Sequence, residues 1–170
     1  PGTVSAPKLR ALREMGVTRV SLGFQSLTPR VLALSGREAS ASDSLGSFLI
    51  ARGVGFREIN MDLLAGLPGA TEESWMDTLE KVAGLEPDCV TIYQLEVTHN
   101  SVLYALLRRG AGPNLASWSE KRRWVDRAFR ALEKVGYTIG SGYMAIRNPE
   151  SWRFVYTVEN FWHGADLLAL

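Results

Sequence analysis

Apolar residues along the chain follow two patterns, one typical of helices and one typical of buried strands, and the two patterns alternate. Continuous apolar runs predict strands over residues 18–26, 58–64 and 88–97. Helical spacing, capping residues and terminal glycines predict the intervening helices. These helices span residues 1–16, 28–34, 42–52, 71–83, 101–109 and 117–135, and a less regular tail follows them.

This order of elements predicts an α/β fold with parallel strands, because helical crossovers connect strands that run in the same direction. The chain opens with a helix that has no strand before it. Three parallel strands cannot close a barrel, and an open sheet of that size leaves an apolar edge. We therefore expect a piece of a larger α/β protein, cut just after a strand and poorly stable alone.

Composition excludes several classes of protein. Of the 170 residues, 46% are apolar and 22% are charged, as in ordinary globular domains. The formal charge of +1 argues against a nucleic-acid or anionic-membrane surface. No apolar run is long enough for a membrane span and no signal segment is evident, so we expect a cytoplasmic protein. A single cysteine, Cys89, permits neither an internal disulfide nor a self-contained iron–sulfur cluster.

Polar side chains mark the carboxyl ends of all three predicted strands, where parallel α/β proteins bind their ligands. Gln25, Asp62 and Glu96 occupy these ends, and together they suit a ligand that carries hydroxyl or amino groups. The alternative is that each side chain only fastens a loop. The glycine turn at residues 66–69 leaves a second alternative, an unrelated barrel that binds a phosphorylated metabolite.

Three segments, in matching order and spacing, resemble the oxygen-independent coproporphyrinogen III oxidase-like family of radical SAM proteins. They are RVSLGFQS at residues 19–26, NMDLLAGLPGAT at residues 60–71 and VTIYQL at residues 90–95. The family patterns are "SxGxQS", "NxDLIYGLPGQT" and "hSxYxL", and the opening PGT resembles the end of the family's "ExNPGT" segment.

The resemblance implies a partial TIM-type (βα)6 barrel whose last three parallel strands lie in residues 1–112, followed by a family-specific helical and irregular extension over residues 113–170. It implies S-adenosylmethionine and a 4Fe-4S cluster as cofactors, with the CxxxCxxC cluster ligands outside this chain. Gln25, Arg37 and Asp62 match family residues that contact S-adenosylmethionine. Glu96 and Ile139 complete the candidate cofactor-binding set.

The implied activity is reductive cleavage of S-adenosylmethionine to a 5′-deoxyadenosyl radical that acts on a porphyrin-type substrate, in haem biosynthesis. The implied partners are a tetrapyrrole-like small molecule and an electron donor such as flavodoxin or ferredoxin. Such a protein is an oxidoreductase when full-length, and this chain alone is expected to be inactive.

The tail departs from the commonest family pattern, because residues 137–145 and 160–168 replace the usual motifs and retain a Trp-x-Gly-x-Asp skeleton. A haem chaperone or a methyltransferase of the same family therefore stays an alternative to the oxidase. His99 and His163 are candidate haem ligands, against the alternative of ordinary hydrogen-bonded histidines. The tail aromatics either line a tetrapyrrole pocket or belong to the core.

Overall fold

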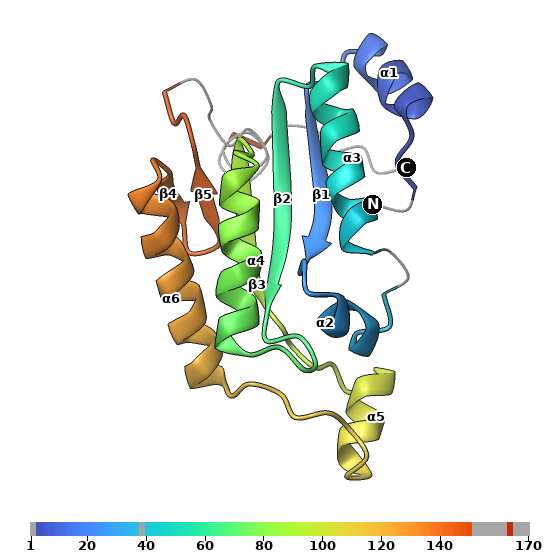
Figure 1. The fold of residues 1–170 in the computed structure, drawn as a ribbon, viewed down its shortest axis with the longest axis vertical. Coiled ribbons are helices and arrows are strands. Elements are labelled where there is room, and N and C mark those ends of the chain that lie inside the picture. Colours follow the sequence, from blue (N-terminus) through green and yellow to red (C-terminus); the bar gives the residue numbers. More distant parts are fainter. Residues whose placement is uncertain (1–2, 38–39, 151–162, 165–170) are drawn as a thin grey trace.

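The computed structural model describes residues 3–37, 40–150 and 163–164. One five-stranded sheet in the order β1-β2-β3-β5-β4 forms its centre. Helices α3, α4 and α6 lie across one face of that sheet, and α1 packs against α3 (Figure 1). The short helices α2 and α5 lie beyond the carboxyl ends of the strands.

The three predicted strands are confirmed, as is their parallel pairing. They are β1 (Arg19–Gln25), β2 (Glu58–Ala65) and β3 (Cys89–Gln94). In β2 the alternation of side chains separates two faces. Ile59, Met61 and Leu63 are fully buried in the core beneath the helices, whereas Asn60 and Asp62 belong to the opposite face. We call this opposite face, which carries no helix among the described residues, the inner face.

The helices form where a polar capping residue precedes a segment whose apolar residues recur at helical spacing. Capping boxes open α3, α4 and α6, with Ser40, Thr71 and Ser117 as the N-caps. Thr71 is the cap that the sequence predicts. The helices are α1 (Ala6–Glu14), α2 (Pro29–Leu34), α3 (Ala41–Val54), α4 (Glu72–Gly84), α5 (Val102–Arg108) and α6 (Trp118–Lys134).

The start of the tail corrects the prediction of an irregular segment after residue 135. Strands β4 (Thr138–Ser141) and β5 (Met144–Ile146) form a hairpin, and β5 pairs antiparallel with β3. The strands are too short, and too interrupted by Gly140 and Gly142, to show a period of two. The hairpin extends the sheet beyond β3 and satisfies the backbone groups of that edge.

None of the helices in the described ranges is both long and apolar enough to cross a membrane.

Candidate functional site

A connected set of polar side chains crosses the inner face of the sheet from β1 to β3. Strand register places Ser21 beside Asn60, and Asp62 beside Thr91. Asn60 Nδ2 donates to Ser21 Oγ at 2.6 Å and to Asp62 Oδ1 at 2.8 Å, while Thr91 Oγ1 donates to Asn60 Oδ1 at 2.9 Å. Ser21 Oγ also lies 3.3 Å from Asp62 Oδ2. We call these residues the inner-face network.

Asp62 is the charged member of the inner-face network, and it is half-buried. Burial raises the pKa of its carboxyl above the ordinary value, against the lowering effects of hydrogen bonds from Asn60 and Ser21 and of the charge on Arg19. A carboxylate accepts hydrogen bonds and cannot donate them. Asp62 therefore suits a ligand that presents hydroxyl or ammonium groups to the inner face.

A β-bulge brings the Gln25 amide to the same face. Gly23 pairs with Asp62 and Gln25 pairs with Leu63, which leaves Phe24 as the extra residue, buried in the core. Gln25 has a φ of +64°, unusual for a residue other than glycine. Its Nε2 lies 2.9 Å from the position that a Cβ on Gly23 would occupy. The glycine thus leaves room for the amide beside the strand position of Asp62.

Arg37 and Glu96 lie apart from this network. Both are exposed, and among the described residues neither side chain forms a hydrogen bond to Asp62 or Asn60. Arg37 follows α2, where its backbone N–H donates to Leu32 O at 3.1 Å. The structure therefore brings together Gln25 and Asp62, and leaves Arg37 and Glu96 on the loops after α2 and β3.

Ile139 lies on the other face of the sheet. It pairs with Ala145, which in turn pairs with Val90, and all three pack in the core beneath the helices. Side chains directly opposite each other share a face, so Ile139 points away from Asp62. The Ile139 side chain therefore lies on the opposite face of the sheet from the Asp62 side chain.

The candidate haem ligands do not gather at one place in the described ranges. His99 is exposed, and its ring packs against Tyr104 with centroids 4.8 Å apart. His163 is exposed as well. The expectations for residues 160–162 and 165–168, and for the aromatic residues between 152 and 162, fall outside the described residues.

Lys121 of α6 reaches the carboxyl ends of β2 and β3, which the sequence analysis does not anticipate. Its side chain is 7% exposed, and its Nζ donates to Leu95 O at 2.7 Å and lies 3.4 Å from the centroid of the Trp118 ring. Burial lowers the pKa of Lys121, while the nearby Glu96 charge raises it. Lys121 therefore fastens the start of α6 to the segment that carries Glu96.

Sequence reasoning also misses Ser21, Asn60 and Thr91. Asn60 and Asp62 stand two residues apart in a strand, so alternation alone places them on one face. That signal is available in the sequence. The register that adds Ser21 and Thr91 depends on strand pairing, which the sequence does not show.

Cys89 does not suit an iron–sulfur cluster. It is fully buried beside Met144 and Ile146, and burial raises the pKa of its thiol to about 12. Clusters are ligated by thiolates, and usually by several. The chemistry of this side chain does not fit the cluster implied by the resemblance.

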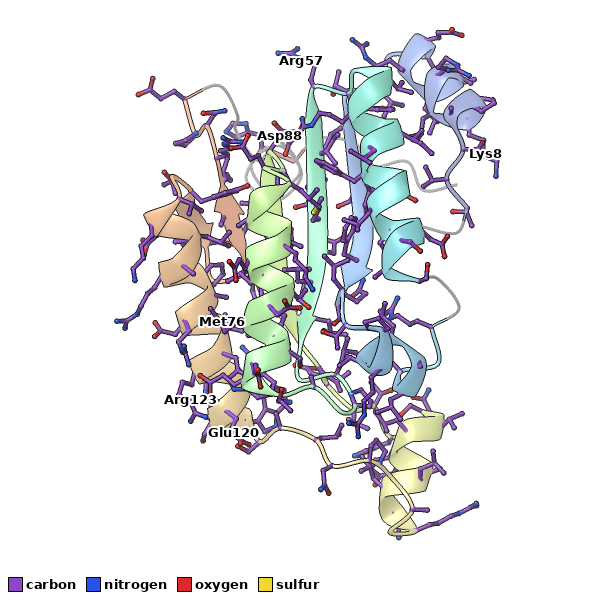
Figure 2. The ribbon with its side chains drawn as sticks, in the orientation of Figure 1. Lys8, Arg57, Met76, Asp88, Glu120 and Arg123 are labelled. Atoms are coloured by element: carbon purple, nitrogen blue, oxygen red, sulfur yellow. The ribbon has the colours of Figure 1, made fainter. Side chains whose placement is uncertain are left out.

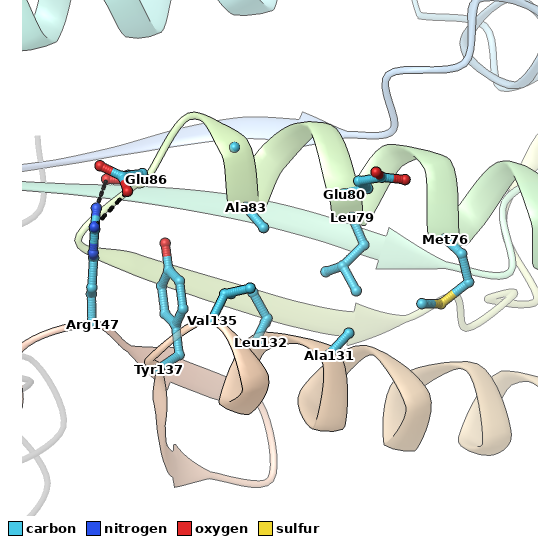
Figure 3. A pocket seen from close by; sticks show the side chains of 11 residues that line it. Met76, Leu79, Glu80, Ala83, Glu86, Ala131, Leu132, Val135, Tyr137 and Arg147 are labelled. Carbon is cyan, nitrogen blue, oxygen red and sulfur yellow. Dashed lines mark hydrogen bonds and ion pairs between the residues drawn. The ribbon is translucent and has the colours of Figure 1, made fainter.

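An apolar pocket lies on the helix-covered side of the sheet, on the opposite face from the inner-face network. It occupies about 520 Å³ between α4 and the end of α6, with Leu79 and Leu132 in its apolar wall (Figure 3). An ion pair between Glu86 and Arg147 (2.6 Å) lies at one end. Figure 2 shows Asp88 near this end of the sheet, whereas Glu120 marks the opposite end, where the strands point. This pocket is therefore separate from the candidate site.

Comparison with known proteins gives consistent matches. Residues 1–82 match the model described as the radical SAM superfamily. "Radical S-adenosyl methionine domain-containing protein 1, mitochondrial" of Mus musculus is 32% identical over 160 residues, which are 90% of this chain and 36% of that protein. Heme chaperone HemW of Bacillus subtilis is 36% identical over 110 residues, or 65% of this chain and 29% of that protein.

The oxygen-independent coproporphyrinogen III oxidase of Salmonella typhimurium is 31% identical over 151 residues, which cover 88% of this chain and 33% of that protein. The solved structure of coproporphyrinogen III oxidase (HemN) from Escherichia coli, titled a radical SAM enzyme, matches with a TM-score of 0.73 and 28% identity. That match covers 86% of this chain and 33% of the solved chain. It confirms the predicted α/β class and partial barrel. This chain spans only about a third of these proteins.

Proposed function

Because the chain belongs to the radical SAM superfamily, we propose that its inner face holds S-adenosylmethionine in a longer radical SAM protein. The observation that carries this proposal is the half-buried Asp62 carboxylate near the carboxyl end of the parallel strands, together with the Gln25 amide, which lies over Gly23, the strand partner of Asp62. Parallel α/β folds bind ligands at this end.

The donor groups of S-adenosylmethionine fit these side chains. Its ribose hydroxyls and its ammonium group donate hydrogen bonds, and Asp62 accepts them. The Gln25 amide both donates and accepts. We propose Arg37 and Glu96 as further contacts from the neighbouring loops, with the Arg37 guanidinium suited to a carboxylate. Ile139 stays a prediction from the family resemblance, and its side chain packs on the other face of the sheet.

The cluster belongs to another part of the protein in this proposal, since Cys89 does not fit it. Bound beside a reduced 4Fe-4S cluster, S-adenosylmethionine would supply radical chemistry able to remove a hydrogen atom from a substrate. The residues of this chain bind and orient the cofactor. A flavodoxin or ferredoxin as electron donor, and the cytoplasm as location, stay predictions.

The proposed substrate is tetrapyrrole-like, because the relatives include coproporphyrinogen III oxidases. The second candidate is a haem chaperone, and the relatives that carry that name support it equally. A methyltransferase of the same family remains a third possibility.

Two assays on the full-length protein separate these functions. After anaerobic reconstitution with iron and sulfide, we expect 5′-deoxyadenosine to form when a reductant and S-adenosylmethionine are added. No binding of S-adenosylmethionine by a protein with an intact cluster would contradict the proposal. Conversion of coproporphyrinogen III would then favour the oxidase, whereas haem binding and transfer without conversion would favour the chaperone.

A further inference from the structure

We propose that Asn60 is a positioning residue that orients the Asp62 carboxylate toward S-adenosylmethionine. This inference rests on the proposed function. Asn60 is 1% exposed, and it lies two residues before Asp62 on the inner face of β2. Because it is buried, Asn60 acts on the ligand through Asp62 and not by direct contact.

Hydrogen-bond chemistry fixes which way the Asn60 amide faces. The Asp62 carboxylate only accepts, so Asn60 must turn its NH₂ group toward Asp62. This leaves Asn60 Oδ1 to accept from Thr91 Oγ1 at 2.9 Å on β3. The same NH₂ group donates to Ser21 Oγ at 2.6 Å on β1. Asn60 thus links all three parallel strands and directs one donor at Asp62 Oδ1, at 2.8 Å.

The electrostatic surroundings make this donor important for the charge on Asp62. Burial raises the pKa of Asp62, and the bond from Asn60 is the largest of the opposing effects. Without that bond, the pKa rises further, and a protonated carboxyl is a poorer acceptor for a ligand ammonium or hydroxyl. The charged and titratable side chains that share the inner face with Asp62 across the three parallel strands are Arg19, Glu58, Cys89 and Tyr93.

These neighbours do not replace the Asn60 donor. Arg19 is already paired with Glu58, with Nε and Oε1 2.9 Å apart. The Cys89 thiol stays neutral near neutral pH, because burial raises its pKa to about 12. Asn60, at 2.8 Å, is therefore the closer of two uncharged donors that keep Asp62 ionised and oriented, the other being Ser21 at 3.3 Å.

The test measures the affinity of the full-length, cluster-reconstituted protein for S-adenosylmethionine by calorimetry at a series of pH values that spans the Asp62 titration. For Asn60→Leu, which keeps the bulk of the side chain and removes its hydrogen bonds, we expect affinity to fall roughly 10-fold at pH values between the Asp62 pKa of the wild-type protein and the higher Asp62 pKa of the variant. The loss should shrink as the pH rises, because Asp62 then ionises without help. Asn148→Leu, at an exposed position after β5, is the matched control and should follow the wild-type profile.

A second readout does not depend on the cofactor. Carbon-13 NMR of the aspartate carboxyls should show a higher Asp62 pKa in Asn60→Leu than in the wild-type protein. Thr91→Val removes the donor that fixes the Asn60 amide, so it should shift both readouts in the same direction by a smaller amount. If Asn60→Leu does not fold, Thr91→Val decides.

An unchanged pH profile and an unchanged Asp62 pKa in a folded variant would overturn the role of Asn60. Asp62→Ala tests the proposed function separately. If Asp62→Ala weakens binding and Asn60→Leu does not, only the positioning role fails. If Asp62→Ala leaves the affinity unchanged, the proposed cofactor site itself is wrong.

Discussion

At Asp62, ligand binding and protein stability make opposite demands on one side chain. Burial raises the pKa of the carboxyl, so the folded protein favours the protonated form more than the unfolded chain does. At neutral pH both states are ionised, and the charge then costs folding free energy. That cost falls as the pH is lowered through the folded-state pKa, and it is absent once both states are protonated.

Asp62→Asn should therefore stabilise the ligand-free full-length protein at pH 7 while weakening its affinity for S-adenosylmethionine. The substituted amide can still bond with Asn60, and it removes the buried charge. Calorimetric melting at pH 7 and pH 4 measures the first effect, and we expect the gain in melting temperature to shrink at the lower pH. A lower melting temperature at pH 7 would contradict this account.

Asp62→Ala removes the acceptor altogether. We expect the affinity for S-adenosylmethionine to fall about 10- to 150-fold, since a hydrogen bond to a charged group contributes about 1.5–3 kcal/mol. Titration calorimetry measures the loss. Asp77→Ala on the exposed face of α4 is the matched control, because its carboxylate pairs with Lys81 at the surface (2.7 Å). A structural role for Asp62 would instead lower the melting temperature and spare the affinity.

At the scale of elements, Lys121 joins α6 to the carboxyl ends of β2 and β3. Its Nζ satisfies the carbonyl of Leu95, and its stem lies against Gly66 in the turn after β2. Gly66 has a φ of +85°, which glycine adopts without strain. The turn, the loop after β3 and the start of α6 thus depend on one side chain.

Lys121→Met should lower the free energy of unfolding by about 1–3 kcal/mol, because it leaves the Leu95 carbonyl without its donor. Denaturant unfolding of the full-length protein checks this value. Lys134→Met, at an exposed position near the end of the same helix, should change stability by less than about 0.5 kcal/mol. Equal losses for the two variants would show that the buried contact contributes nothing specific.

Gly66→Ala and Gly46→Ala should have opposite effects on stability. A Cβ on Gly66 would lie 2.4 Å from Lys121 Cδ, in addition to the strained backbone, so this variant should be destabilised. At Gly46 in α3 a Cβ meets nothing within 4 Å, and alanine should stabilise the helix by about 0.5–1 kcal/mol. Paired thermal melts of the two variants measure both signs.

The elements that the sequence predicts correctly are those with strong local signals. The apolar runs of β1 to β3 and the Thr71 cap of α4 lie within single short segments. The hairpin of β4 and β5 lacks such a local signal, because β5 depends on pairing with β3, which is distant in the sequence. The same reason explains the candidate site: Gln25 and Asp62 follow from strand ends, whereas Ser21, Thr91 and Lys121 enter through register and helix packing. The face on which the Ile139 side chain lies also depends on strand pairing, so a motif match does not show it.

At the scale of the whole molecule, the chain carries the inner face of the sheet without the several thiols that an iron–sulfur cluster needs. Its single thiol, that of Cys89, is buried and packs against Met144 and Ile146. Reconstitution of the isolated chain should therefore yield no stoichiometric cluster, as measured by iron and sulfide content and visible absorbance. Cys89→Ala should retain the same residual iron. A stable cluster that Cys89→Ala abolishes would contradict this prediction.

The antiparallel hairpin also limits how a barrel can be completed around this sheet. A cylinder of strands closes only when its last strand bonds to its first, and β5 already occupies the edge of β3 that such closure would use. On the opposite side, further parallel strands can join at β1. Any cylinder built on this sheet therefore runs from β1 round to the hairpin, so that two antiparallel strands interrupt its ring of parallel strands.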